Sequence, residues 1–361
     1  MSKTVPKLTS IEPEVLPETG EDTSVQPATS GERPSARRLN RDVRPEVEIP
    51  DDLGKLVERD AALVRELGWE GMVAARRGRG DLTDMRGFTH PAKRLLRLYG
   101  SKGVPVKLKG GDWDRDRLEA AIDRGPHASC HAHREFLFEE FTNMINLNQW
   151  LILPYSVAKD LPHLHVSPPG VVPQRNRRPR WICDYTWSGV NDETLPLAPR
   201  DSLQYGRALE RYLRHILLAD PQWGPVHVFK CDLSDGYYRL GVIPYDAPKL
   251  GMAFPGTYKG EPLVAIPLVL PMGWTNSGPA FCAATETVAD LTNAQLPHRT
   301  NVPPHSMDDR AAALDKLRLV TPTDEKLPAR HPALPEGRTR PAAYVDIFVD
   351  DFIALAQGNE Q

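Results

Sequence analysis

The stretch AYVDIFVDDFIALA, residues 343–356, decides how this chain is expected to fold. Its two apolar runs, Ala343–Val349 and Phe352–Ala356, are separated only by Asp350 and Asp351. Strand-forming runs on both sides of two turn-forming acids predict a β-hairpin with both carboxylates at its tip. Adjacent carboxylates between apolar strands are costly to bury, so we expect a divalent cation to compensate them. The alternative is an ordinary acidic turn, because Asp is common in turns.

A third carboxylate, Asp232, stands near the end of the strand-like run VHVFKCDL, residues 226–233. Carboxylates from neighbouring strands hold the ions of two-metal sites, in which Mg²⁺ ions about 4 Å apart support phosphoryl or nucleotidyl transfer. The sequence therefore predicts a site for two Mg²⁺ ions, with Mn²⁺ as the alternative ion, built from Asp232, Asp350 and Asp351.

The composition argues against several classes of protein. The chain has 361 residues, with 45 Lys and Arg against 48 Asp and Glu, and this balance argues against nucleic-acid binding through bulk charge alone. It has no long apolar run and no apolar leader, so we expect no transmembrane span, no secretory signal and no membrane partner. Four scattered cysteines favour a reducing compartment, so we expect an intracellular protein, cytoplasmic or nuclear.

Proline, aromatic residues and charge are unevenly distributed along the chain. Residues 1–60 and 297–342 are rich in Pro and contain no Phe, Trp or Tyr, so they can bury little apolar surface. We therefore expect residues 1–50 to form a disordered arm and residues 297–342 a mobile insertion. Residues 61–180 are basic and residues 181–361 acidic, which fits phosphate contacts in one half and metal-binding carboxylates in the other. Ordinary scatter of surface charge is the alternative.

Hydrophobic periodicity predicts a mixture of helices and strands. The spacing of apolar residues indicates helices over residues 51–65, 92–98, 134–146, 202–218 and 276–290. Short apolar runs indicate strands over residues 149–155, 180–185, 226–233 and 263–270. Because these elements do not alternate as repeating βα units, the sequence predicts an α+β fold with an antiparallel sheet.

Four segments resemble the motifs of reverse transcriptases, and they occur in the order of that family. They are RWICDY (180–185) with Val190-Asn191, DLSDGY (232–237), LPMGWTNS (270–277) and FVDD (348–351). The first is similar to the fingers segment, the next two to the first and second palm motifs, and the last to the Tyr-x-Asp-Asp box. Phe348 replaces the usual Tyr, and Gly278 adds one residue after the second palm motif. The chain looks most like the polymerase of LTR retrotransposons.

The resemblance implies the fingers and a partial palm of a right-hand polymerase, with an antiparallel sheet and no thumb. It covers residues 134–296 and 343–356. We accordingly expect a helical N-terminal extension over residues 51–133, a fingers-like region over 134–225 and a partial palm over 226–361.

The resemblance also implies roles for the acids and for one tyrosine. Asp232 and Asp350 would be the main metal ligands, Asp351 the third acid, and the carbonyl oxygen of Leu233 a backbone ligand. Tyr237 occupies the position whose ring excludes a ribose 2′-hydroxyl, which would select deoxynucleotides by steric clash.

Basic residues and the second palm motif are expected to bind the nucleotide. Arg180 matches a fingers arginine that grips the triphosphate, a task that suits a guanidinium because it is always charged and can bond two oxygens. A second basic fingertip residue is expected among Arg175, Arg177 and Arg178. The resemblance implies that Met272, Gly273 and Trp274 line the nucleotide and template pocket, with Gly273 allowing close backbone approach.

Taken together, the resemblance implies an RNA-directed DNA polymerase domain of a retroelement. It would extend a primer 3′-hydroxyl on an RNA or DNA template with deoxynucleoside triphosphates. Because the chain stops soon after Asp351, we expect a truncated polymerase that is inactive alone, with the missing C-terminal parts on another chain. The alternatives are an inactive relic or nucleic-acid-binding fragment, and an unrelated metal-dependent transferase.

Two further groups of residues have both a functional and a plain interpretation. A compact His/Cys group could bind zinc, but its spacing differs from that of common zinc sites, which favours an ordinary loop before a helix. The group comprises His127, Cys130, His131 and His133. The run RNRRPR, residues 175–180, could be a nuclear-localisation patch, but phosphate contact is the preferred interpretation.

Overall fold

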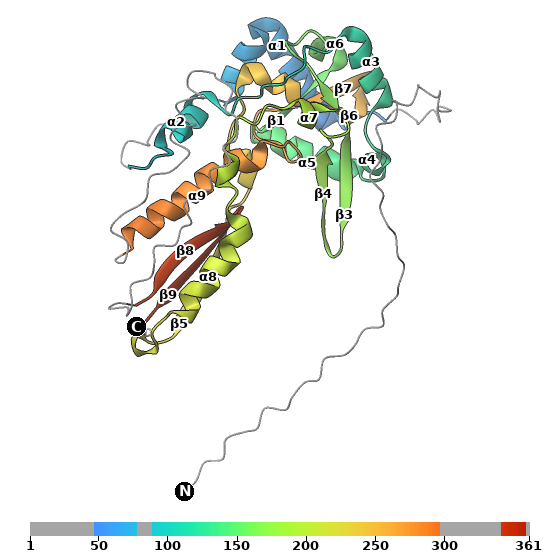
Figure 1. Ribbon diagram of the computed structural model, residues 1–361. Coiled ribbons are helices and arrows are strands. Elements are labelled where there is room, and N and C mark those ends of the chain that lie inside the picture. The colour runs from blue at the N-terminus through green and yellow to red at the C-terminus, as the bar shows by residue number, and fades with distance from the viewer. Residues whose placement is uncertain (1–46, 78–88, 297–340, 359–361) are drawn as a thin grey trace, which may run out of the picture. The chain divides into compact units, whose positions relative to one another are not determined.

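The computed structural model describes residues 47–77, 89–296 and 341–358, which form a mixed α+β fold as predicted (Figure 1). The helices are α1 (Asp51–Arg77), α2 (Lys93–Lys102), α3 (Arg115–Arg124), α4 (Ala128–Ala132), α5 (Arg134–Asn146), α6 (Tyr155–Ala158), α7 (Val190–Glu193), α8 (Ala208–Leu217) and α9 (Ser277–Gln295). The strands are β1 (Trp150–Pro154), β2 (Val166–Ser167), β3 (Pro169–Gln174), β4 (Arg177–Cys183), β5 (Val226–Asp232), β6 (Gly251–Tyr258), β7 (Glu261–Pro267), β8 (Ala343–Phe348) and β9 (Asp351–Gln357). Short 3₁₀ helices include η1 (Arg200–Ser202), η2 (Tyr205–Arg207), η4 (Gly236–Arg239) and η5 (Pro244–Leu250).

The main core surrounds a four-stranded sheet of order β1-β7-β6-β2. The run WLILP forms β1 and is buried along its whole length, as expected for a continuous apolar run covered on both faces. Helices α1 and α5 pack against it. Aromatic rings fill the space between them: Phe141 lies 5.5 Å from Trp150 and 5.1 Å from Phe254, measured between ring centroids.

Strands β3 and β4 form a separate antiparallel hairpin, which Figure 1 shows extending away from the four-stranded sheet. Its turn lies between Gln174 and Arg177, where Asn176 has a φ of 58°. Asn tolerates this left-handed conformation better than most residues. The basic run RNRRPR therefore lies at the turn of this hairpin and along β4.

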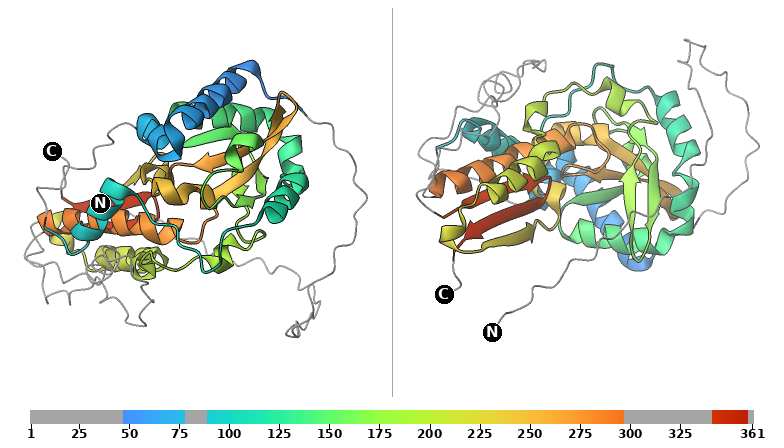
Figure 2. Two further views of the ribbon diagram at one scale, coloured as in Figure 1. Left: turned by 90° about the horizontal axis from the view of Figure 1, so that it is seen from above. Right: turned by 60° about the horizontal axis from the view of Figure 1, so that its bottom comes forward.

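A three-stranded antiparallel sheet of order β5-β9-β8 carries the predicted Asp-Asp hairpin. Helices α8 and α9 pack against β8, and Figure 2 shows both helices alongside the three strands. The sequence placed both acids at the tip of the hairpin, which is wrong for one of them. Val349 and Asp350 form the turn, whereas Asp351 is the first residue of β9 and pairs with Phe348.

The continuous helix predicted over residues 202–218 is wrong in its first part. Two 3₁₀ turns, η1 and η2, precede α8, which begins at Ala208. The Ser202 hydroxyl donates to the carbonyl oxygens of Pro199 and Pro279, each at 2.7 Å. Such side-chain bonds to the backbone compete with helix formation, and here they tie η1 to the start of α9.

The two segments predicted to be disordered or mobile extend slightly too far. Residues 1–46 and 297–340 lie outside the described residues, but residues 47–50 do not. Thr257 on β6 binds this segment, because its N–H donates to Val47 O and its carbonyl accepts from Ile49 N–H, both at 2.9 Å. At the end of the second segment, Ala342 is buried and its N–H donates to Gln357 Oε1 at 3.1 Å.

The predicted boundary between residues 225 and 226 does not coincide with the division of the sheets. Strands β1 and β2 precede it, yet they pair with β7 and β6, which follow it. The predicted limits of the fingers-like region and the partial palm are not tested by the sheets and remain a prediction. None of the described helices is both long and apolar enough to cross a membrane.

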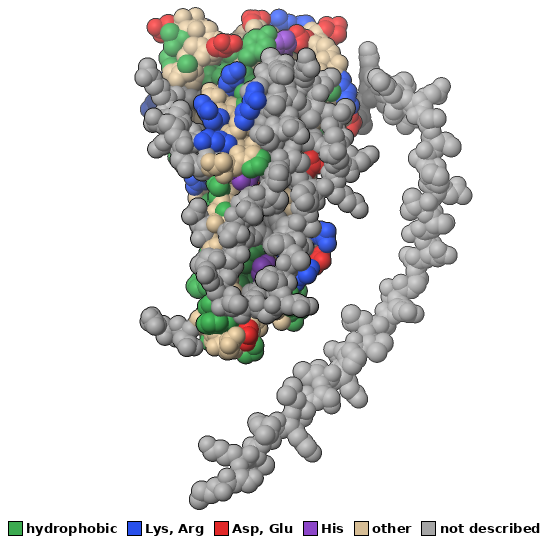
Figure 3. Space-filling model, turned by 60° about the vertical axis from the view of Figure 1, so that its left-hand side comes forward, with side chains coloured by type: hydrophobic (Ala, Val, Ile, Leu, Met, Phe, Trp, Pro, Cys, Tyr) green, Lys and Arg blue, Asp and Glu red, His purple; other side chains and the backbone are tan. Residues whose placement is uncertain are grey.

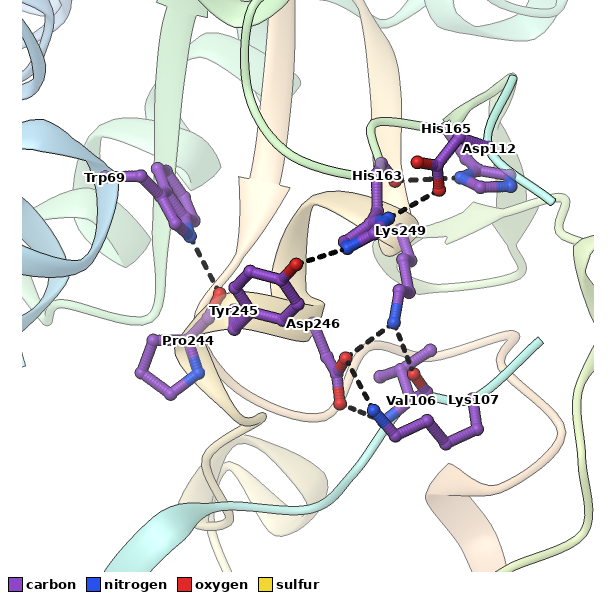
Figure 4. A network of polar contacts seen from close by, with 10 residues as sticks. All are labelled: Trp69, Val106, Lys107, Asp112, His163, His165, Pro244, Tyr245, Asp246 and Lys249. Atoms are coloured by element: carbon purple, nitrogen blue, oxygen red, sulfur yellow. Dashed lines mark hydrogen bonds and ion pairs between the residues drawn. The ribbon is translucent and has the colours of Figure 1, made fainter.

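A buried ion pair within η5 forms hydrogen bonds to the extended segment after α2 (Figure 4). Lys249 Nζ lies 2.6 Å from Asp246 Oδ1 and donates to Val106 O at 3.0 Å. The other oxygen of Asp246 accepts from Val106 N–H at 3.0 Å. Nearby, Trp69 on α1 donates to Pro244 O at 2.7 Å, so one network joins three parts of the chain.

Candidate metal-binding site

The pairing of β5 with β9 brings the three predicted carboxylates together. Asp232, the last residue of β5, lies opposite Asp351, the first residue of β9, and Asp350 precedes it in the turn. One ligand oxygen from each acid lies within 4.8 Å of the other two. We call these three residues the carboxylate cluster. In the described ranges it is the one group of three His, Cys, Asp or Glu residues that has this geometry.

The turn that carries Asp350 has an unusual backbone. Val349 has a φ of 61°, which is costly for a β-branched residue, on the order of 1–3 kcal/mol. The Asp350 carbonyl oxygen accepts from Leu233 N–H at 3.0 Å, so the turn is tied to the end of β5. A Cβ built on Gly236 would lie 3.8 Å from Cβ of Asp350, which places the 233–236 loop directly against that side chain.

The proposed backbone ligand, Leu233, is partly engaged within the loop. Its carbonyl oxygen accepts from Gly236 N–H at 3.4 Å, a long hydrogen bond. A carbonyl has two lone pairs, so this bond leaves one for another partner.

Charge at the carboxylate cluster is only partly compensated. Lys230 Nζ lies 2.8 Å from Asp351 Oδ2, and this hydrogen bond raises the pKa of Lys230. Asp232 and Asp350 form no ion pair with any described residue. Carboxylate oxygens are the ligands that Mg²⁺ and Mn²⁺ prefer, so the donor set fits these ions. A bound cation would also reduce the repulsion between the three carboxylates.

Tyr237 lies beside the carboxylate cluster, with its ring held in place. The ring packs edge-on against Phe281 of α9, with 5.1 Å between centroids. A Cβ built on Gly278 would lie 3.6 Å from the Tyr237 hydroxyl, so the start of α9 approaches this hydroxyl closely. Burial is the main cause that raises the pKa of Tyr237 to about 12, and the charge of Asp350 adds to it. The phenol therefore stays protonated at neutral pH.

The segment Met272–Trp274 forms a tight turn against the end of β4. Gly273 has a φ of 101°, and a Cβ there would lie 2.2 Å from Cys183 O, so only glycine fits. Met272 is half-buried and Gly273 is exposed. Trp274, in contrast, is buried and donates from Nε1 to Thr194 Oγ1 at 3.0 Å. Its side chain therefore packs in the core.

Asn191 holds this turn, and the sequence reasoning gave it no role. Its Nδ2 donates to Gly273 O and its Oδ1 accepts from Thr275 N–H, both at 3.0 Å. An amide that both donates and accepts can fix two backbone groups at once. The signal in the sequence was the Val190-Asn191 pair that follows the fingers-like segment.

Arg180 lies on β4, opposite Val172, with its side chain exposed. The described contacts include no hydrogen bond or ion pair between Arg180 and the carboxylate cluster. Arg178 is engaged with α5, because it forms ion pairs with Glu140 at 3.1 Å and Glu139 at 3.4 Å. Arg175, Arg177 and Arg178 all remain candidates for the second basic residue, because ion pairs of an exposed arginine are weak.

The His/Cys group makes ordinary protein contacts. His127 Nε2 lies 3.1 Å from Asp184 Oδ2, and the Cys130 thiol donates to Pro169 O at 3.2 Å. His131 Nδ1 lies 3.0 Å from an Arg134 guanidinium nitrogen. Burial raises the pKa of the Cys130 thiol to about 12. These contacts support a structural role, but the predicted loop is wrong: Cys130 and His131 lie in the short helix α4, between His127 and His133.

Basic side chains also gather on one face of the molecule. Figure 3 shows Lys and Arg side chains gathered on the face turned forward there, which is the side of α2 in Figure 1. The sequence of α2, KRLLRLYGSK, contains basic residues and no acid. A surface of this kind is suited to phosphate groups.

Comparison with known proteins adds no family assignment. The chain gives no match to any protein-family model and none to the curated proteins.

Proposed function

We propose that this chain is the RNA-directed DNA polymerase domain of a reverse transcriptase from a retroelement. The observation that carries the proposal is the carboxylate cluster, in which Asp232 meets Asp350 and Asp351 across a β-sheet. The order of the four sequence motifs supports the same function. In this proposal, β1 to β4 belong to the fingers-like region, residues 134–225, and the three-stranded sheet belongs to the partial palm, residues 226–361.

In this proposal Asp232 and Asp350 hold the two Mg²⁺ ions, since neither is paired with a cation in the described chain. When bound, the ions would lower the pKa of the primer 3′-hydroxyl and neutralise the leaving pyrophosphate. Asp351 has the weaker role, because Lys230 already compensates its charge.

Tyr237 selects the sugar in this proposal. Its ring is fixed by Phe281, so it cannot turn aside for a ribose 2′-hydroxyl. Arg180, exposed on β4, would bond the triphosphate of the incoming deoxynucleotide, and an RNA or DNA template-primer would be the second substrate. Arginine suits this role because its planar fork bonds two phosphate oxygens.

A primer-extension assay on the full chain tests the proposal. The substrates are an RNA template with a DNA primer, deoxynucleoside triphosphates and Mg²⁺. The sequence predicts little or no product from this chain alone. Any Mg²⁺-dependent extension that is measured should fall at least about 10²-fold in Asp350→Asn, because one metal ligand is lost. Asp160→Asn is the matched control. Asp160 is also an exposed acid, but it pairs with Arg115 and does not belong to the carboxylate cluster. Measurable extension that is equal in Asp350→Asn and the wild type would contradict the proposal.

The second candidate is a chain that binds nucleic acid without turnover. The Lys230–Asp351 ion pair favours it, because an ammonium group already compensates one of the three acids. The two candidates predict different outcomes. The second is favoured if the chain binds a template-primer without extending it and if Asp350→Asn binds the template-primer equally well. The Tyr237→Ala variant adds a separate test, because only a polymerase would then begin to incorporate ribonucleotides.

A further inference from the structure

One face of β8 makes three successive contacts with the segment from η2 to α8. Tyr344 stacks on His215, with 3.8 Å between ring centroids and an angle of 11°. Asp346 pairs with Arg211, and the ring of Phe348 packs edge-on against Tyr205 at 5.4 Å. Residues 344, 346 and 348 share one face because side chains alternate along a strand. The last of these contacts lies two residues before Asp350.

The central contact is a buried, doubly bonded ion pair. Arg211 donates from Nε to one Asp346 oxygen and from Nη2 to the other, both at 2.6 Å. The same carboxylate accepts from the Tyr344 hydroxyl at 2.6 Å and from Ile347 N–H at 2.8 Å. Arg211 also donates to Gln204 O at 3.2 Å, which links the pair to the turn before α8. With four donors, the Asp346 charge is well satisfied despite its burial.

The outer edge of β8 is closed by side chains instead of another strand. Asn293 of α9 donates to Val345 O at 2.7 Å and accepts from Val345 N–H at 2.9 Å. The next N–H along this edge of β8, that of Ile347, donates to the Asp346 carboxylate. Strand β8 is therefore held on one face by α8 and along its edge by α9, with little freedom to slide.

This restraint reaches the carboxylate cluster through the turn. The strained backbone of Val349 persists only if its surroundings hold it, and β8 is one of the two strands that do so. We propose that Arg211 and Asp346 are positioning residues: their ion pair fixes β8, and through it the place of Asp350 opposite Asp232. The inference rests on the proposed function, since it assigns the pair a role in metal binding by the carboxylate cluster.

Mn²⁺ binding to the full-length chain, followed by electron paramagnetic resonance, tests this role without polymerase turnover. We expect Asp346→Asn to weaken Mn²⁺ binding about tenfold, as other residues outside the ligand set do. Asp246→Asn is the matched control, because it also removes a charge from a buried ion pair, but one that does not contact the cluster. Asp246→Asn should lose about as much stability as Asp346→Asn, but it should bind Mn²⁺ as tightly as the wild type.

Two milder variants cover the case in which Asp346→Asn does not fold. Arg211→Lys keeps the charge and loses the doubly bonded geometry, and Arg211→Met with Asp346→Leu replaces the pair by apolar side chains of similar size. Both should weaken Mn²⁺ binding while the protein stays folded. Binding equal to that of the wild type in a folded variant, or an equal loss in Asp246→Asn, would overturn the positioning role. Failure of the proposed function looks different: the wild type would bind no Mn²⁺, or Asp350→Asn would bind it equally well.

Discussion

The two larger sheets of this protein differ in how much of them is buried. Every residue of β1 is buried, and so are the last five residues of β7 beside it. In β5, by contrast, the last five of seven residues are exposed. The first sheet stabilises the fold by removing apolar surface from water, whereas the second sheet leaves much of β5, including Lys230 and Asp232, exposed to solvent. Under the proposed function, the sheet that buries most apolar surface and the sheet that carries the carboxylate cluster would be different ones.

The largest expected effect is the loss of a core side chain from the buried sheet. Trp150→Ala removes a fully buried ring that lies 5.1 Å from Trp181, and should cost about 3–5 kcal/mol of unfolding free energy. Phe229→Ala, on the exposed strand β5, should change the same quantity by less than about 0.5 kcal/mol. Urea denaturation of both variants gives the comparison. Similar losses would mean that the two sheets do not differ in this way.

A buried histidine beside the first sheet should make stability depend on pH. Burial lowers the pKa of His165 to about 4, from an ordinary value near 6.5, so the folded protein keeps this ring neutral. The unfolded chain binds the proton first, and stability should fall as the pH drops from about 6.5 to about 4. The loss is roughly 3 kcal/mol at most.

Denaturation at a series of pH values measures this dependence. His165→Gln should remove most of the decline between pH 6.5 and 4, whereas His133→Gln, at a half-buried histidine, should keep it. A decline of the same size in both variants would show that His165 is not its source.

The turn at Gly273 should respond to a single methyl group. Gly273→Ala places a Cβ 2.2 Å from Cys183 O at a φ of 101°, so the turn must move. We expect a loss on the order of 1–3 kcal/mol in urea denaturation. Gly111→Ala is the control, because no atom lies within 4 Å of a Cβ there. A loss no greater than that of the control would contradict the close approach.

The smallest expected effect concerns the strained turn of the exposed sheet. Val349→Gly relieves the backbone strain but loses a half-buried side chain, whereas Val345→Gly loses a similar side chain without any relief. Val349→Gly should therefore be the less destabilising, by about 1–2 kcal/mol. Urea denaturation of the two variants side by side tests this order, and the reverse order would argue against strain at Val349.

Patterns along the chain predicted the elements better than the contacts between them. Residues 134–146 form α5 as the spacing of apolar residues indicated, and the Asp-Asp hairpin lies where the two apolar runs placed it. The 3₁₀ turns before α8 were missed because they depend on Ser202 bonding to Pro279, which is distant in sequence. Local periodicity carries no information about such a partner.

The candidate site could be predicted only in part, again because local patterns do not reveal partners that are distant in sequence. Asp232, Asp350 and Asp351 follow or interrupt apolar runs, so strand pairing alone brings them together. Asp346 was overlooked because a buried acid within a strand is indistinguishable by pattern from an exposed one. Its partner Arg211 lies on a helix that precedes it by more than a hundred residues.

The register of β5 against β9 has a consequence for how this site can change over time. Asp232 faces Asp351 directly, and side chains alternate between the two faces of a sheet. A slip of one residue would turn the Asp232 carboxylate to the opposite face and leave its partners behind. Insertions and deletions in β5 cannot adjust the spacing of the acids by degrees, so length variation among descendants of this chain should be confined to segments outside the two paired strands.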